Sequence, residues 1–311
     1  KQDDDRERLR TLFYFQNQIK QIQNRKGNKM DVWRQVVEYF QRFKEWHNQS
    51  ELYHKIGYLI TVGQISLQEL IKESATCSKK DFIKMLDKWI SDSIRFEKDY
   101  DELSYDIPSD KANIEKLLIL FNVISAYKNG DKSLRFPFSE HKNKKGGWSL
   151  EHIHAQQSDG LKTAELWKEW LTLHVASLRS IDEERYHDLI EEINLSIPNI
   201  TGERFHELFD KVINQLDLER STDYIHSLSN MALLGRDDNS ALNNSTFDVK
   251  RDKILEMDKK GDYIPICTRR VFLKYYTQSA HNQIHFWGEE DRKDYRAAMN
   301  TILKPFMSKE D

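Results

Sequence analysis

The sequence predicts a mostly α-helical globular protein. The 5 Pro and 11 Gly in 311 residues are too few turn residues for a many-stranded sandwich or barrel, which needs a turn about every 8 to 12 residues. Apolar residues return instead at three- and four-residue steps, which is the period of an amphipathic helix. The 15 Phe, 13 Tyr and 7 Trp supply large side chains for a core, although 32% of the residues are charged.

Three stretches of the first half show the helical period most clearly, and each is expected to be a helix whose apolar stripe lies in a core. Asp31, Ser78 and Asp110 stand where N-caps of these helices would lie. The stripes consist of Trp33, Val36, Val37, Phe40 and Phe43, then Phe82, Leu86, Trp89 and Ile90, then Ile114, Leu117, Leu118 and Phe121.

Composition excludes several classes of protein. No apolar run approaches the roughly 20 residues that span a bilayer, and the charged residues 1–10 have no signal-peptide stretch behind them. Cys77 and Cys267 lie far apart, which indicates a reducing cytoplasm and leaves no cysteine-based zinc site. Residues 1–150 carry 27 basic and 22 acidic side chains, and residues 151–311 carry 21 and 29. A polyanion would therefore bind only part of the surface.

The pattern changes near residue 130. Residues 134–138 and 148–154 read as two short extended segments joined by a basic, glycine-ended turn, which predicts a strand pair. The segments expected after it are helices over 160–219, a short apolar segment at 231–234, a polar loop at 235–239, a helix over about 240–259, an extended segment at 264–268, and final helices at 271–278 and 289–303.

The densest chemical string, W-S-L-E-H-I-H-A-Q, covers residues 148–156. In an extended segment, His152 and His154 would point to one face and Glu151 to the other. A His-x-His pair can supply the first two ligands of a zinc site, but no second cluster of ligands follows it in the sequence. A surface histidine pair without a role is another interpretation. The third is phosphodiester hydrolysis, which needs a general base such as histidine and a cation held by oxygen ligands.

Longer motifs carry a resemblance to known nucleases. The string E-H-I-H-A-Q at 151–156 resembles the D/E-H-I-x-P-Q strand of HNH (His-Me finger) nucleases, and residues 230–239 resemble their N-x-x-L loop that ends in a second Asn. Residues 229–250 are also similar to the signature GNLTLL … NSxLxNxxFxxK of the D component of GmrSD-type restriction proteins. The C-terminal strings at 263–274 and 287–295 look like that family's C-terminus, so the similarity extends over about 134–303.

The resemblance implies a fold in which an HNH-like ββα-metal finger is embedded in helices. Residues 1–130 would be a helical connector or interaction region, and residues 131–311 the HNH-like nuclease domain with a helical insert at 160–222. In that family the nuclease domain commonly follows a ParB-like domain that hydrolyses nucleotides. The D-G-Q-Q-R string of such a domain is absent from this sequence. We therefore expect the C-terminal portion of a longer protein, without nucleotide chemistry of its own.

The resemblance also implies the roles of the site residues. His152 would be the general base that deprotonates water, while Glu151 and Asn239 would hold one Mg²⁺ or Mn²⁺ ion. Asn230 would fix the loop geometry, and Lys250 would meet a phosphate or the active-site carboxylate.

The chain departs from the family pattern at two of these positions. Ala155 replaces the usual proline, which would loosen the turn that presents the base. Glu151 stands where many relatives have Asp, so the metal would lie about one methylene further from the backbone.

Contacts to DNA are expected from the basic turn, because lysines that bind phosphates give sequence-independent affinity. A solvated turn without DNA contact is the alternative. Trp148 could stack on a base or lie in the core. The acidic segment 182–192 should face away from DNA. The lysines of the turn are Lys142, Lys144 and Lys145.

The expected function is a divalent-metal-dependent DNA endonuclease module of a bacterial restriction or anti-phage defence protein, located in the cytoplasm and outside membranes. Its partners would be DNA, including modified phage DNA, and the ParB-like nucleotide-hydrolysing domain. The alternative is a catalytically inactive helical module that binds DNA or another protein.

Overall fold

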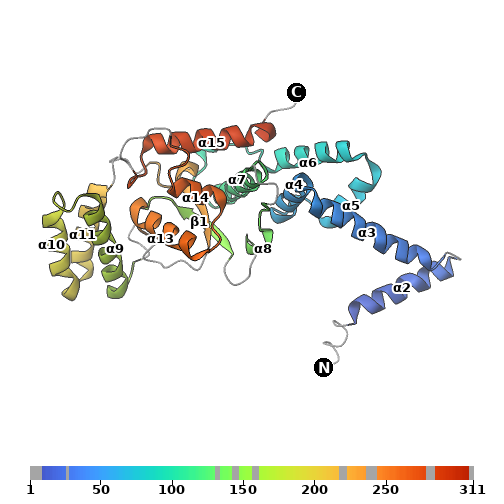
Figure 1. Cartoon of the computed structure of the whole chain (residues 1–311), viewed down its shortest axis with the longest axis horizontal. Coiled ribbons are helices and arrows are strands. Elements are labelled where there is room, and N and C mark those ends of the chain that lie inside the picture. The colour runs from blue at the N-terminus through green and yellow to red at the C-terminus, as the bar shows by residue number, and fades with distance from the viewer. Residues whose placement is uncertain are drawn as a thin grey trace. The chain divides into compact units, whose positions relative to one another are not determined.

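The computed structural model describes residues 9–25, 28–129, 134–141, 147–155, 161–216, 223–235, 244–277 and 284–307 (Figure 1). These residues are mostly helical and include one two-stranded antiparallel sheet, which confirms the helical class. The chain forms two compact units, residues 1–56 and 57–311. Among the described helices, none combines the length and the apolar character needed to cross a bilayer.

The first unit contains α2 (Arg10–Asn24) and α3 (Met30–Asn48), and α4 (Ser50–Thr61) begins in it. Helix α3 has the predicted period, but its stripe is not core: Trp33 is 61% exposed and Phe40 is 65% exposed. Helix α2 buries none of its own side chains. Two helices offer too few neighbours to cover a whole apolar stripe, so the predicted core is wrong here.

Helix α7 (Pro108–Tyr127) is the central helix of the second unit. Its side chains are buried on nearly every face between Ile114 and Ala126, and it packs against the sheet strand β2 (Met231–Gly235) and two C-terminal helices. Because the partners of α7 come from the C-terminal half, residues 57–130 fold together with the predicted nuclease region. The compact units therefore do not follow the predicted boundary at residue 130.

Two more helices, α5 (Leu67–Thr76) and α6 (Lys79–Ser93), precede α7, with a short 3-10 turn, η1 (Tyr100–Glu102), between α6 and α7. Ser78 is the N-cap of α6, as predicted, because its hydroxyl accepts the Asp81 N–H at 3.2 Å.

The two other predicted N-caps lie inside their helices. Asp31 is in the first turn of α3. Asp110 is buried in the first turn of α7, where it accepts hydrogen bonds from Lys98 Nζ at 2.8 Å and the Ser104 N–H at 3.3 Å.

The sheet differs from the predicted strand pair. Strand β1 (Trp148–His152) pairs with β2, in an antiparallel register from Trp148↔Gly235 to His152↔Met231. Residues 134–137 form no strand, and 138–141 form the short helix α8 (Phe138–His141). Phe136 is fully buried, with its ring edge-on to Trp148 at 5.3 Å. The segment predicted as the first strand thus contacts β1 through its side chains. The strand that forms backbone hydrogen bonds with β1 is the short apolar segment at 231–234.

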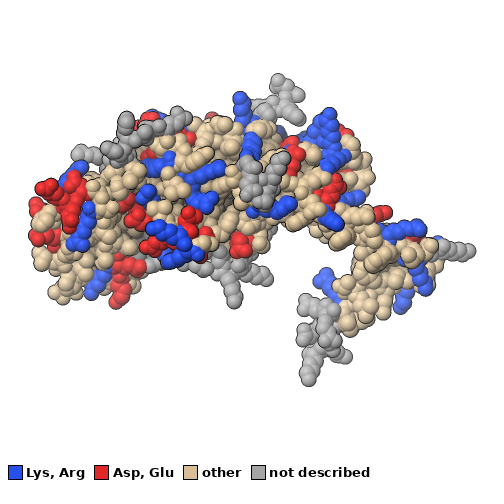
Figure 2. Space-filling view, in the orientation of Figure 1, with Lys and Arg blue, Asp and Glu red and all other residues tan. Residues whose placement is uncertain are grey.

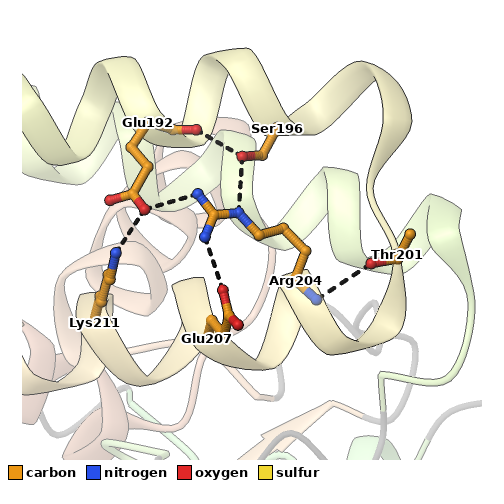
Figure 3. Close-up of polar contacts among 6 residues, drawn as sticks. All are labelled: Glu192, Ser196, Thr201, Arg204, Glu207 and Lys211. Carbon is orange, nitrogen blue, oxygen red and sulfur yellow. Dashed lines mark hydrogen bonds and ion pairs between the residues drawn. The ribbon is translucent and has the colours of Figure 1, made fainter.

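Helices fill the predicted insert and share a core of their own, in which Trp170 and Phe205 are fully buried. On its surface, Glu192 of one helix accepts bonds from Arg204 at 2.7 Å and Lys211 at 2.5 Å of the next (Figure 3). Acidic side chains gather over α10 (Figure 2, left). The elements are α9 (Ala164–Asp182), α10 (His187–Ser196), η2 (Ile197–Asn199) and α11 (Gly202–Leu216).

Two of the C-terminal helices begin at other residues than predicted. Helix α13 starts at Phe247, whereas the helix was predicted from about residue 240. Residues 240–243 lie outside the described residues, and 244–246 are not helical. Helix α14 starts inside the predicted extended segment, because Pro265 presets the φ angle for a helix start. The elements are η3 (Leu228–Asn230), α13 (Phe247–Lys260), α14 (Ile266–Phe272) and α15 (Glu289–Met307).

Candidate active site

Strand β1, strand β2 and helix α13 bring three separate sequence motifs together. Glu151 and His152 end β1, Asn230 directly precedes β2, and Lys250 lies on α13. Glu151 pairs with Ala232 across the sheet. Glu151, His152 and Lys250 line one small pocket, whose other walls are Ala232, Leu234, Ile254, Thr268 and Phe272.

Lys250 ties the end of β1 to α13. Its side chain is buried, and its Nζ donates a hydrogen bond of 2.5 Å to the backbone carbonyl of His152. A hydrogen bond from an ammonium group to a carbonyl is stronger than one between neutral groups. Lys250 is therefore an internal contact of the site, and is not a solvated surface charge.

The imidazole of His152 is half-buried beside two other aromatic rings. Its Nε2 lies 3.3 Å from Nδ1 of His226, and its ring lies 4.8 Å from that of Tyr105. Within the described ranges, Nδ1 of His152 has no hydrogen-bond partner. Burial, together with the charges of Lys250, His226 and Lys111, lowers the pKa of His152 to about 3. The ring is thus neutral near pH 7 and can accept a proton.

Asn230 is fully buried and holds the bend that follows β1. Its Oδ1 accepts the His154 N–H at 3.0 Å, and its Nδ2 donates to the His154 carbonyl at 2.8 Å and the Ile225 carbonyl at 2.9 Å. Its own carbonyl accepts the Ile153 N–H at 2.8 Å. Both ends of the amide are therefore used to join the two segments.

Ala155 makes a bond that the usual proline of this motif could not make. Its N–H donates to the Ser245 carbonyl at 3.3 Å, shortly before α13 begins. Proline has no N–H, so the replacement adds a tie between the turn after β1 and the helix that follows β2. The turn is held at this point, where the sequence suggested that it would be loosened.

His154 does not share a face with His152, so that prediction is wrong. Strand β1 ends at His152 and the chain bends at 153–154, which carries His154 into the core with 2% exposure. There its Nδ1 accepts the N–H of Phe247, the first residue of α13, at 3.2 Å. His154 is thereby used as a cap for a free helix amide.

A second imidazole caps the same helix. Nε2 of the fully buried His174, on α9, accepts the Thr246 N–H at 3.3 Å, and its Nδ1 donates to the Trp170 carbonyl at 2.8 Å. Two further bonds join α9 to this region: Trp170 Nε1 donates to the Asn244 carbonyl at 2.9 Å, and Ser177 Oγ to Asp248 at 2.5 Å. No sequence signal pointed to His174, because a histidine within an amphipathic helix is usually interpreted as a surface residue.

Because two buried histidines cap α13, we expect the free energy of unfolding to depend on pH. Burial lowers the pKa of His154 and of His174 from 6.5 to about 3. Between these values the unfolded chain is protonated and the folded protein is not. The free energy of unfolding therefore has its full value above pH 6.5. It falls as the pH decreases toward 3, by up to about 1.4 kcal/mol per pH unit for each histidine.

Urea unfolding at several pH values measures this slope. The variant His174→Gln can still accept a hydrogen bond but does not titrate, so its slope should be shallower than that of the parent. An unchanged slope in this variant would show that His174 is not the titrating group.

Several predicted residues lie outside the described residues, namely Asn239, Lys142, Lys144 and Lys145. Trp148 is buried, and its ring stacks on that of Tyr263 at 5.4 Å, so it belongs to the core and is not available for a base. Among the described residues, no three His, Cys, Asp or Glu side chains form a group that could hold a metal ion.

Sequence reasoning missed His226, Tyr105 and Lys111. His226 stands four positions before Asn230, so a histidine close to the motif was the available signal. Tyr105 and Lys111 belong to the region predicted as a connector, and no sequence signal joined them to the motif. Their association with His152 exists only in the folded chain.

Comparison with known proteins supports the motif-based resemblance over part of the chain. Residues 207–300 match the family model described as GmrSD restriction endonucleases, C-terminal domain. No curated protein and no solved structure matches the chain. The matched range contains β2, α13, α14 and much of α15, with Asn230 and Lys250, and it begins after Glu151 and His152. Residues 207–300 are therefore similar to the C-terminal domain of GmrSD restriction endonucleases, the family that the motifs predicted.

Proposed function

We propose that β1, β2 and α13 form an HNH-like finger that cuts DNA with the help of a divalent cation. One observation carries the proposal: residues of three distant motifs meet around the end of one strand. Lys250 bonds to the His152 carbonyl, Asn230 bonds to the backbone of His154, and Glu151 lines the same pocket as His152 and Lys250. The order strand, strand, helix is the order of the ββα finger. The match of residues 207–300 to restriction endonucleases supports DNA as the substrate.

His152 would act as the general base. Its Nδ1 takes a proton from a water molecule, the oxygen of that water forms a bond to phosphorus, and the bond from phosphorus to the leaving oxygen breaks. The leaving oxygen then takes a proton from solvent. A phosphate beside the ring would raise the pKa of His152 from its low value, because a negative charge favours the imidazolium form.

The described residues offer one carboxylate, that of Glu151, for a magnesium or manganese ion. Such hard cations take oxygen ligands and need only one or two protein carboxylates, because water and substrate phosphate complete the shell. The Glu151 carboxylate, which lines the pocket beside α13, would be one ligand, and the Asn239 amide oxygen would be another. When bound there, the ion would neutralise charge on the phosphate and on the leaving oxygen.

Lys250 would position the site and not contact the phosphate directly. Its ammonium group is already bonded to the His152 carbonyl and lines the pocket that also contains Glu151. A cation in this place fixes the end of β1 and favours the ionised carboxylate. Asn230 would also position the site, because it fixes the bend after β1.

We also propose a substrate, a partner domain and a cellular location. The DNA would be phage DNA, with or without modified bases, and the basic turn at 142–145 would contact its backbone. A ParB-like nucleotide-hydrolysing domain would be the partner of this module, in the cytoplasm of a bacterium. These elements follow from the family similarity and from the charge of the turn.

Nicking of supercoiled plasmid tests the metal-dependent reaction. We expect open-circular product with Mg²⁺ or Mn²⁺ and none with EDTA, because the proposed ligands are a carboxylate and an amide oxygen, which a hard cation prefers. Plasmids with and without modified cytosine are compared, so that a requirement for modification is detected. Equal nicking in EDTA would contradict a metal-dependent mechanism.

The second candidate is a helical interaction module without catalysis. It is favoured by the first unit, where Trp33, Tyr39 and Phe40 of α3 are exposed. Exposed aromatic side chains on one helix are typical of a surface that binds another protein. Absence of nicking on every plasmid and with either metal would favour this candidate.

A further inference from the structure

We propose that His226 is a positioning residue for His152, and that Tyr105 holds His226 in place. This inference rests on the proposed endonuclease function and deepens it. It assigns a role to a histidine that lies outside the signature motifs, and it gives the segment before α7 a part in the site.

The geometry places His226 at one end of the His152 imidazole. Nε2 of His152 and Nδ1 of His226 are 3.3 Å apart, and the ring centroids are 5.4 Å apart at an angle of 69°. A hydrogen bond at Nε2 leaves Nδ1 of His152 as the nitrogen that can accept a proton. Histidine bases in enzymes are commonly oriented by a third group that bonds their other nitrogen.

The direction of the bond fixes the useful tautomer. If Nε2–H of His152 donates to Nδ1 of His226, then Nδ1 of His152 carries a free electron pair and can act as the base. After His152 has taken the proton from water, Nε2–H still donates to His226. The bond therefore persists through the step and keeps the ring in the same orientation.

The segment before α7 holds His226 from its backbone. The Tyr105 N–H donates to the His226 carbonyl at 2.8 Å, and Ser104 and Ser227 form an isolated antiparallel bridge. These bonds fix the backbone of His226 without using its ring. Nδ1 of the ring lies against Nε2 of His152.

One side chain of the same segment packs against the ring. The Tyr105 ring lies nearly parallel to that of His226, at 13° and 6.2 Å, and edge-on to His152 at 4.8 Å. Its hydroxyl accepts a hydrogen bond of 2.9 Å from Lys111 Nζ. Tyr105 therefore lies against both imidazole rings and keeps them side by side.

Cleavage kinetics on duplex DNA with Mg²⁺ test the role. The variant His226→Ala is expected to lower kcat about 10- to 100-fold, by analogy with the loss found when a group that orients a metal-bound histidine is removed. KM for DNA should stay unchanged, because His226 is not placed to bind the substrate. The variant His226→Asn should restore most of kcat, since its amide oxygen can accept the bond from Nε2–H. His187→Ala removes an exposed histidine of α10 and is the matched control.

A second measurement does not depend on cleavage. Nitrogen-15 chemical shifts of labelled histidines report which imidazole nitrogen carries the proton, and His152→Gln assigns the His152 signals. The parent should show His152 protonated at Nε2, His226→Ala should show a mixture of tautomers, and His226→Asn should resemble the parent. Unfolding curves of each variant check that the fold is retained.

The two measurements separate the two proposals. If the parent cuts DNA and His226→Ala has the kcat of the parent, the positioning role is overturned and the endonuclease function stands. If the parent does not cut with either metal, the endonuclease function fails. In that case the nitrogen-15 signal of His152 alone tests the positioning role. If the signal is unchanged in His226→Ala, the positioning role is overturned. If the signal is altered in His226→Ala and restored in His226→Asn, the positioning role is supported.

Discussion

Replacing His152 with alanine is expected to lower the rate of DNA cleavage by about 10²- to 10⁴-fold, the usual contribution of a general base. The side chain carries the chemistry, whereas the backbone carbonyl of His152, which binds Lys250, remains in the variant. The fold should therefore be retained. Single-turnover cleavage of supercoiled plasmid in Mg²⁺ measures the rate, and circular dichroism with a urea unfolding curve checks the structure.

The exposed His187 of α10 offers the control for this experiment, because His187→Ala removes an imidazole far from the site in sequence and without a contact to it in the described residues. Its cleavage rate should equal that of the parent. A His152→Ala protein that is folded and cuts as fast as the parent would rule out His152 as the base. The phosphodiester chemistry would then need another proton acceptor.

The variant Asn230→Asp is expected to destabilise the protein by at least about 3 kcal/mol and to abolish cleavage. The substitution keeps the shape of the side chain but replaces the Nδ2 donor by an oxygen. That oxygen would face the carbonyl oxygens of His154 and Ile225 at hydrogen-bond distance in a fully buried place. Lost bonds to buried groups cost about 1 to 3 kcal/mol each, and an unpaired buried charge costs more.

Urea denaturation measures the loss in the free energy of unfolding. Asn214→Asp makes the same chemical change at an exposed position on α11, and it should alter stability by less than about 0.5 kcal/mol. If Asn230→Asp were as stable as Asn214→Asp, the buried bonds of Asn230 would not hold the bend after β1. Loss of cleavage alone, with full stability, would instead give Asn230 a direct part in the chemistry.

The helices could be predicted from the sequence because their signal is local. The stripe from Ile114 to Phe121 repeats with the helical period, and α7 buries it completely. Whether a stripe becomes core depends on what covers it, and the period does not contain that information. The stripe of α3 has the same pattern, yet Trp33 and Phe40 remain exposed.

Strand pairing could not be predicted in the same way. The extended segments at 134–138 and 148–154 are close in sequence, which favoured a hairpin, but β1 pairs with residues 231–235. A strand's partner is set by the burial of both faces, and α7, α13 and α14 supply that burial here. A short apolar segment far along the chain gives no sign of its register.

The motifs identified Glu151, His152, Asn230 and Lys250, and the folded chain joins them by contacts that the sequence does not show. The bond from Lys250 to a backbone carbonyl is one such contact, since a lysine in a motif suggests a phosphate ligand. His226 became visible only as a neighbour of His152. Residues whose role is to hold another residue leave little pattern, because many residue types can do it.

The imidazole caps of α13 have a consequence for how the protein could be shortened. His174 belongs to the insert, and α9 reaches the same helix start through Trp170 and Ser177. Splicing out α9, α10 and α11 would remove the hydrogen-bond partners of the Thr246 N–H and the Asn244 carbonyl, and would leave the Asp248 carboxylate with His285 but without Ser177. A shortened chain without this three-helix lobe should therefore be destabilised at the start of α13, and the lobe is an architectural requirement of the fold that surrounds it.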